Sequence, residues 1–76
     1  MTKLMSECEI GESGSVKKVS GEGRMRRRLF DMGITPGAPF TMKKRAPFGD
    51  PIEITLRGYE LTLRLSEAAC VEVEIQ

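Results

Sequence analysis

The sequence of 76 residues contains no histidine and no tryptophan, and its two cysteines do not form a CxxC motif. Histidine is the commonest transition-metal ligand and the commonest general base in proteins. Without it, we expect neither a closed tetrahedral zinc site within one chain nor acid–base catalysis. A Walker A sequence and any Ser/His or Cys/His pair are absent as well. We therefore expect a protein that is not an enzyme.

Long apolar segments are also missing. No run approaches the roughly 18 residues that a membrane span needs, and the N-terminal segment MTKLMSECEIGES is too polar for a signal peptide. With 39% hydrophobic and 30% charged residues, the composition is typical of a soluble globular domain. We expect one cytoplasmic domain over residues 1–76, without membrane insertion. In that compartment both cysteines should stay thiols, Cys70 buried and Cys8 partly buried, rather than form a disulfide.

Net charge is small, only +1, but the charges are unevenly distributed. Residues 16–46 carry a net charge of +7, whereas residues 1–15 carry −2 and residues 47–76 carry −4. Four arginines fall within residues 24–28. Such a bipolar surface favours docking onto an acidic partner.

Residues 22–32 are predicted to form an amphipathic helix. Met25, Leu29 and Met32 recur at i, i+4 and i+7, which places them in one apolar stripe. Gly33 follows directly, where a left-handed glycine commonly ends a helix. The arginines are therefore, in the first place, the exposed side of a helix that packs through its other face.

Period-two alternation of apolar and polar residues begins after residue 38 and is typical of half-buried strands. If Arg57 and Gly58 form a two-residue turn, every apolar residue of the two flanking strands lies on one face. In this register Leu56 lies opposite Tyr59. We expect both Phe40 and Tyr59 to belong to the core.

Further strands are predicted at residues 15–20 and 71–75, with short helical turns near residues 4–8 and 66–70. About five short strands, one inserted helix and tight turns indicate a mainly β protein, a small SH3-like or OB-like barrel. The segment at residues 46–51 is rich in proline and glycine, which excludes regular pairing and predicts a stiff, projecting loop.

A nucleic-acid-binding module that uses the basic segment at residues 17–45 is the alternative function. Small barrels of that kind combine a basic stripe with exposed aromatic side chains on which bases stack. With Phe40 and Tyr59 assigned to the core, only Phe30 and Phe48 remain for stacking. The nearly neutral net charge is also unlike the strongly basic footprint of such domains. We therefore expect no nucleic-acid partner.

Three segments carry a family resemblance, in this order: RRRLFDMGITPGAPF, KRAPFGDPIEI and RGYELTLRLSEAACVEVE. The sequence resembles the small bacterial ferrous iron transport protein A (FeoA) family from about Leu4 to Ile75. The resemblance implies an SH3-like β-barrel with one inserted helix. It also implies a cytosolic, non-enzymatic accessory of ferrous iron uptake that regulates or assembles the membrane transporter FeoB, whose cytosolic part hydrolyses GTP. Related domains occur fused to iron-responsive or manganese-responsive repressors.

With the resemblance, two surfaces become candidates for binding the cytosolic region of such a transporter. The loop is a candidate because a preordered segment with an exposed apolar tip loses little entropy on docking. The helix is a candidate because of its charge. The expected partner-binding residues are Pro47, Phe48, Gly49, Asp50, Pro51, Arg24, Arg27 and Arg28.

Metal ligands are not assigned. Carboxylates and two cysteines without histidine would bind ferrous or another transition metal only weakly, so no tightly bound cofactor is expected. Short exposed edge strands leave a weak homodimer open.

Overall fold

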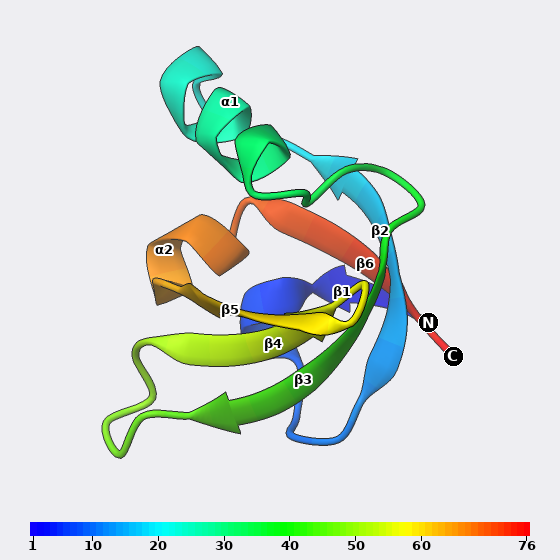
Figure 1. Cartoon of the computed structure of the whole chain (residues 1–76), viewed down its shortest axis with the longest axis vertical. Coiled ribbons are helices and arrows are strands. Elements are labelled where there is room, and N and C mark those ends of the chain that lie inside the picture. The colour runs from blue at the N-terminus through cyan, green and yellow to red at the C-terminus, as the bar shows by residue number, and fades with distance from the viewer.

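In the computed structural model, which describes residues 1–76, six strands form one antiparallel sheet in the order β1-β6-β2-β3-β4-β5. The elements are β1 (Thr2–Leu4), the 3-10 helix η1 (Met5–Glu7), β2 (Ser13–Val19), α1 (Gly23–Asp31), β3 (Pro39–Arg45), β4 (Ile52–Leu56), β5 (Tyr59–Leu63), α2 (Leu65–Ala68) and β6 (Val71–Ile75). The sheet curls strongly on itself (Figure 1). Helix α1 lies at one end of the molecule, and the β3–β4 loop projects at the other (Figure 1).

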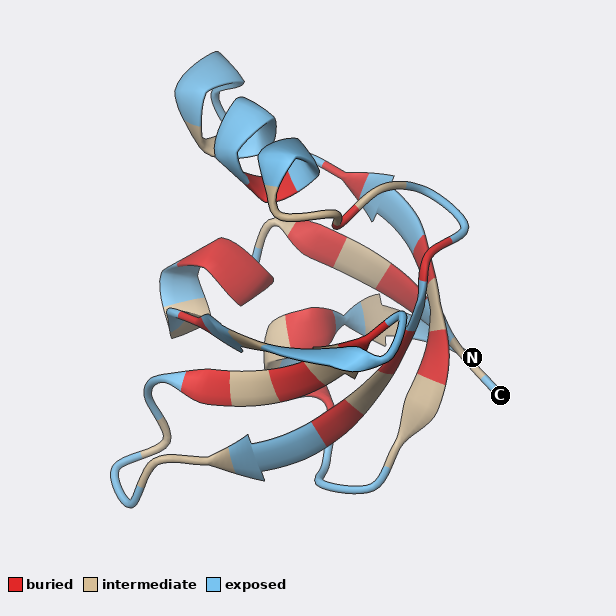
Figure 2. Cartoon of the chain, in the orientation of Figure 1, coloured by how far each residue is buried: buried red, intermediate tan, exposed pale blue.

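The core consists of the inward-facing residues of the curled sheet together with six buried residues outside it, which are Met5, Cys8, Leu29, Ile34, Ala38 and Ala68. Buried positions alternate with more exposed ones along β4, as the period-two pattern predicts (Figure 2). Phe40 is 3% exposed and belongs to this core, as expected. Burial of alternate residues on one face is what holds a half-buried strand in its register.

The β4–β5 hairpin has the predicted register, with Leu56 paired to Tyr59, Ile54 to Leu61 and Ile52 to Leu63. Its turn residues, Arg57 and Gly58, have φ values of 50° and 89°. Two successive positive φ values are characteristic of the type I′ turn, whose twist matches that of the flanking strands.

Strand β2 is irregular. Val16 and Val19 are both buried although they are three residues apart, which a regular strand does not allow. The register against β6 shifts between Val16 and Lys18, so Lys17 is an extra residue at a β-bulge. The bulge returns Val19 to the core face.

The predicted helix at residues 22–32 is confirmed as α1, which is flanked by Glu22 and Met32 as its caps. Leu29 is fully buried, and Met25 and Met32 pack against the core from half-buried positions. Gly33 follows with φ of 95°, the left-handed conformation expected after the helix. None of the helices is long and apolar enough to span a membrane.

Several details differ from the expectations. The segment Thr2–Leu4 forms a sixth strand paired with β6, where no strand was predicted. Tyr59 was expected in the core, but it is 46% exposed because its hydroxyl donates a hydrogen bond to the main-chain oxygen of Met32 at 3.0 Å. The cysteines are both free thiols with the expected burial reversed, since Cys8 is fully buried and Cys70 half-buried.

Gly14 allows β2 to lie close to β6, because a Cβ atom there would overlap the main-chain oxygen of Glu74. We predict that Gly14→Ala lowers the free energy of unfolding by roughly 2 kcal/mol or more, the range typical of overpacking. The matched control is Gly23→Ala, where an added Cβ meets no atom within 4 Å at the start of α1. That variant should be unchanged or stabilised by up to about 1 kcal/mol. Equal stabilities of the two variants in chemical denaturation would contradict the close approach.

The Lys3–Glu12 ion pair, 2.8 Å between Nζ and Oε1, links β1 to the loop before β2. The hydrogen bond from Lys3, with another from the main-chain N–H of Glu9, holds the pKa of the Glu12 carboxyl below its ordinary value. A lowered folded-state pKa contributes stability above the unfolded-state pKa, and this stability is lost as the pH falls through the folded-state value.

We therefore predict that Lys3→Met raises the pKa of Glu12, measured by NMR titration of its side-chain carbon. The same change should reduce the stability difference between pH 7 and pH 3. A Glu12 pKa that does not move in the variant would show that the pair does not form in solution.

Candidate functional site

The loop at residues 46–51 carries the most exposed large apolar side chain of the protein, Phe48, which is 98% exposed. Two main-chain hydrogen bonds close the loop, from Ala46 to the oxygen of Pro51 at 2.9 Å and from Gly49 to the oxygen of Ala46 at 2.8 Å. Gly49 has φ of 87°, a conformation that glycine adopts without strain. The predicted projecting loop is therefore a closed turn with an aromatic ring at its tip.

Asp50 anchors this loop to the short helix α2. Its Oδ1 accepts a hydrogen bond from the main-chain N–H of Leu65, the first residue of α2, at 2.9 Å. The first N–H groups of a helix have no partner within the helix, and an acidic oxygen is a favourable acceptor for them. Asp50, which sequence reasoning assigned to partner binding, thus also has a role within the chain.

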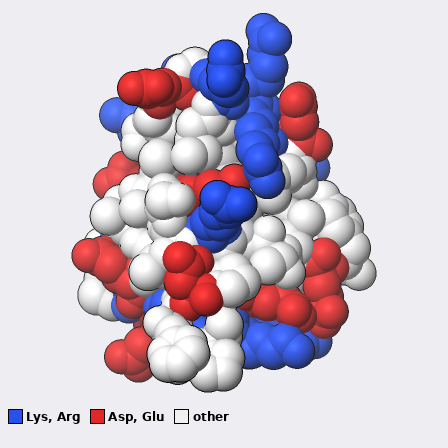
Figure 3. Space-filling model, turned by 90° about the vertical axis from the view of Figure 1, so that its left-hand side faces the viewer, with Lys and Arg blue, Asp and Glu red and all other residues white.

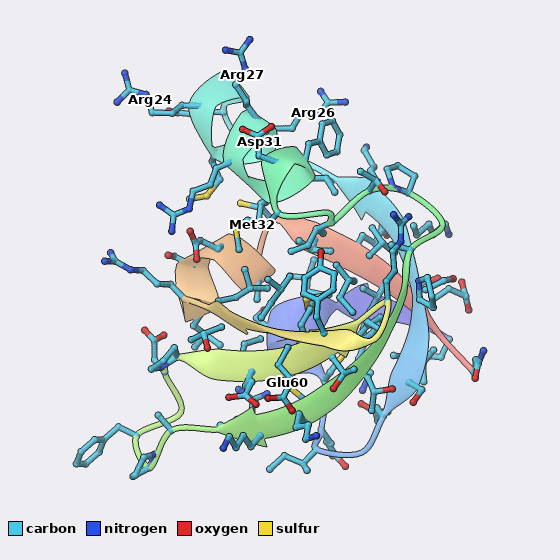
Figure 4. All side chains as sticks on the ribbon, in the orientation of Figure 1. Arg24, Arg26, Arg27, Asp31, Met32 and Glu60 are labelled. Atoms are coloured by element: carbon cyan, nitrogen blue, oxygen red, sulfur yellow. The ribbon has the colours of Figure 1, made fainter.

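The predicted arginine surface lies on α1. Arg24, Arg26 and Arg27 point away from the barrel (Figure 4), and none of them is in an ion pair. The guanidinium of Arg26 lies 5.5 Å from the centroid of the Phe30 ring, within the range of a cation–π contact. Arg28 differs from the others, because its Nε lies 3.0 Å from Oε2 of Glu67 in α2.

Glu67 is the one buried charged residue, at 4% exposure. Its Oε1 accepts a hydrogen bond at 2.8 Å from the main-chain N–H of Arg64, the residue that caps α2. Its other oxygen pairs with Arg28, so both are satisfied. The sequence predicted a helical turn here, but it did not predict that Glu67 would be buried and would join the cap of α2 to Arg28. The available signal was an acidic residue three positions after the helix cap.

The basic residues of β3 do not join this surface. In β3, Lys43 lies 2.8 Å from Glu60 and Lys44 lies 3.9 Å from Glu53. The hydrogen bond and charge of Lys43 hold the pKa of Glu60 below its ordinary value, and Glu60 in turn raises the pKa of Lys43. Arg45 donates hydrogen bonds to main-chain oxygens of the N-terminal segment.

Basic side chains consequently gather most densely at the end of the molecule that carries α1, while elsewhere on the same face acidic side chains lie among them (Figure 3). On this face the basic side chains do not form the continuous basic groove that the nucleic-acid alternative requires (Figure 3). The loop and the arginine helix are not brought together either. They lie at opposite ends of the long axis, which measures 29 Å (Figure 1).

No group of three or more cysteine, aspartate or glutamate side chains lies close enough to hold a metal ion. Burial raises the pKa of the Cys8 thiol, and Cys8 is fully enclosed in the core. The Sγ of Cys70 donates to the main-chain oxygen of Ser66 at 3.7 Å. The residues present therefore do not fit a resident metal site.

Comparison with known proteins identifies relatives along nearly the whole chain. Residues 3–75 match the family model of the FeoA domain. The Fe(2+) transport protein A/Fe(2+) transporter FeoB fusion protein of Porphyromonas gingivalis (strain ATCC BAA-308 / W83) is 34% identical over 71 residues, which cover 93% of this chain. The chain spans only 8% of the length of that relative.

Solved structures confirm the fold. A crystal structure of an iron uptake regulatory protein (FeoA) has a TM-score of 0.92 and 30% identity, with 100% of both chains covered. The FeoA of Stenotrophomonas maltophilia, described as a prokaryotic SH3 domain protein and solved in complex with zinc, has a TM-score of 0.81 and 28% identity. That match covers 95% of this chain and 89% of the other. The predicted SH3-like barrel is thus confirmed, with six strands rather than about five.

If Asp50 fixes the base of the loop, Asp50→Ala should release it. We predict faster amide exchange and lower NMR order parameters at residues 46–49, and a loss of about 1 kcal/mol in the free energy of unfolding, typical of a lost helix cap. Asp50→Asn keeps a side-chain oxygen that accepts the same hydrogen bond and should retain most of the order. A loop that is equally ordered in Asp50→Ala would show that the anchor is unnecessary.

Proposed function

Because the chain belongs to the FeoA family, we propose that it is a cytoplasmic, non-enzymatic accessory protein of ferrous iron uptake. In this proposal it binds the cytosolic region of a FeoB-like transporter. Phe48 at the tip of the loop is the central contact, and the arginines of α1 form a second contact at the far end of the molecule.

The observation that carries this proposal is the exposure of Phe48. An aromatic side chain that is 98% exposed contributes nothing to the core, and leaving it in water is unfavourable. The loop that carries it is closed by its own hydrogen bonds and fixed by Asp50. A partner that covers Phe48 therefore gains the burial of an aromatic ring without first having to order the loop.

The arginines of α1 supply positive charge for a second contact, with an acidic surface of the partner. Arg24, Arg26 and Arg27 form no ion pair with an acidic side chain of the chain, so their positive charges remain available to a partner. Exposed charges of this type mainly accelerate encounter with an acidic surface and do so less at high salt. We assign the specificity of docking to the loop and the rate of encounter to the helix.

The fusion relative supports the choice of partner. Its name places transport protein A and the transporter FeoB on one polypeptide. Tethering raises the effective concentration of two binding surfaces without any new contact. In the proposal, the loop and α1 are the surfaces of this domain that make the contact with the transporter.

We do not propose that this chain carries iron. The Stenotrophomonas maltophilia FeoA was solved with zinc, but here no three potential ligands lie together. Ferrous iron is the cargo of the transporter, and contact of this protein with the ion is weak and transient in the proposed mechanism.

We predict that Phe48→Ser weakens binding to the isolated cytosolic region of the transporter by roughly 10- to 30-fold, the effect of losing a central aromatic contact. Isothermal titration calorimetry measures the affinity, and thermal unfolding should show an unchanged midpoint because the side chain makes no core contact.

The matched control for this experiment is Ile10→Ser. Ile10 is also an exposed apolar residue, at 61%, on a different loop. The Ile10→Ser variant should bind the transporter region with the same affinity as the unmodified protein. If both variants bind equally, or if the unmodified protein does not bind at all, the loop is not the docking surface.

A further inference from the structure

A groove of about 380 Å³ opens between α1 and α2. Arg24 and Arg28 line it from the α1 side, and Arg64 lines it from the start of α2. Half-buried Met25 and buried Glu67 are also among the residues that line the groove. Three arginine residues, two from α1 and one from the start of α2, thus line one open groove.

Two of the three arginines in the groove have no acidic partner in the chain. Arg24 and Arg64 are exposed and form no ion pair. Glu67 does not neutralise them, since its two oxygens are occupied by the Arg28 guanidinium and the main-chain N–H of Arg64. Glu22 is the other acidic residue of the groove and is exposed at the start of α1.

The ion pair with Glu67 holds Arg28 in place but leaves most of its side chain accessible to a further group. The contact to Glu67 runs through Nε at 3.0 Å, and the side chain remains 65% exposed. An arginine that is already oriented loses less rotamer freedom when it binds a further group. The buried carboxylate of Glu67 therefore prepares Arg28 to face the groove.

We propose that this groove receives a carboxylate side chain of an acidic segment in the protein partner. Arginines bind carboxylates through paired hydrogen bonds, which are among the strongest that side chains form. Met25 offers an apolar contact for the methylene groups of a glutamate, which a phosphate ion would leave unused. The inference rests on the proposed function for the identity of the partner, and it adds Arg64 to the docking residues.

The first test uses the isolated protein and defined probes. We compare an acetylated and amidated peptide of alternating glutamate and leucine, the same peptide with glutamine for glutamate, and inorganic phosphate. The acidic peptide should shift the backbone amide resonances of Arg24, Arg28 and Arg64. It should also bind at least about fivefold more tightly than its glutamine counterpart. Phosphate that binds as tightly as the acidic peptide would overturn the assignment to carboxylates.

Two variants separate the groove from the general charge of the protein. Arg64→Gln should weaken binding of the acidic peptide by at least about fivefold. Arg57→Gln removes the same charge from an exposed residue of the β4–β5 turn, outside the groove and outside α1, and should change the affinity less than about twofold. Equal losses in the two variants would mean that only net charge matters and would overturn the proposal.

A final comparison uses the cytosolic region of the transporter with Phe48→Ser and Arg64→Gln. Weaker binding of both variants supports the groove as part of the docking surface. If Phe48→Ser weakens binding and Arg64→Gln does not, the proposed function stands and the groove assignment fails. If neither variant changes the affinity, the proposed function itself fails.

Discussion

A single buried carboxylate, that of Glu67, connects the helices of this small barrel. It accepts a hydrogen bond from the cap of α2 and pairs with Arg28 of α1. A buried charge is stable only when its partners are in place, so the position of α1 relative to α2 is tied to this contact. Helix α2 also holds the loop, because the N–H of Leu65 bonds to Asp50. The four residues of α2 are therefore the common anchor of both candidate docking surfaces.

This arrangement gives a physical reason why two surfaces at opposite ends of the molecule act together. The loop is bonded to α2 through Asp50, and the arginine helix is held by its packing on the core and by the Arg28–Glu67 ion pair to α2. A partner that contacts both meets them at a set separation, so little conformational entropy is lost on binding. The arginine-lined groove lies between the same two helices, and Arg28 belongs to both the anchor and the groove.

Local patterns were sufficient to predict much of the fold. The apolar stripe of α1, the alternation in β4 and β5 and the prolines of the loop are each visible in a few residues of sequence. Strand β1 was missed because three residues are too few to show alternation, and its pairing depends on β6 at the other end of the chain. Tyr59 was misplaced because its hydrogen bond to Met32 is also distant in sequence.

In the candidate site, too, local features could be predicted from the sequence and long-range contacts could not. Exposure of Phe48 and of the α1 arginines could be predicted, whereas the contacts of Asp50 with Leu65 and of Arg28 with Glu67 could not, because they join segments that no local pattern relates.

The most direct test of the central claim is photo-cross-linking. Phe48 is replaced by photoreactive benzoylphenylalanine, and the variant is irradiated in cells that contain the FeoB-like transporter. The account predicts a covalent adduct with the transporter from position 48 and none from position 74, an exposed residue of β6 that belongs to neither proposed surface. Adducts from position 74 but not from position 48 would contradict it.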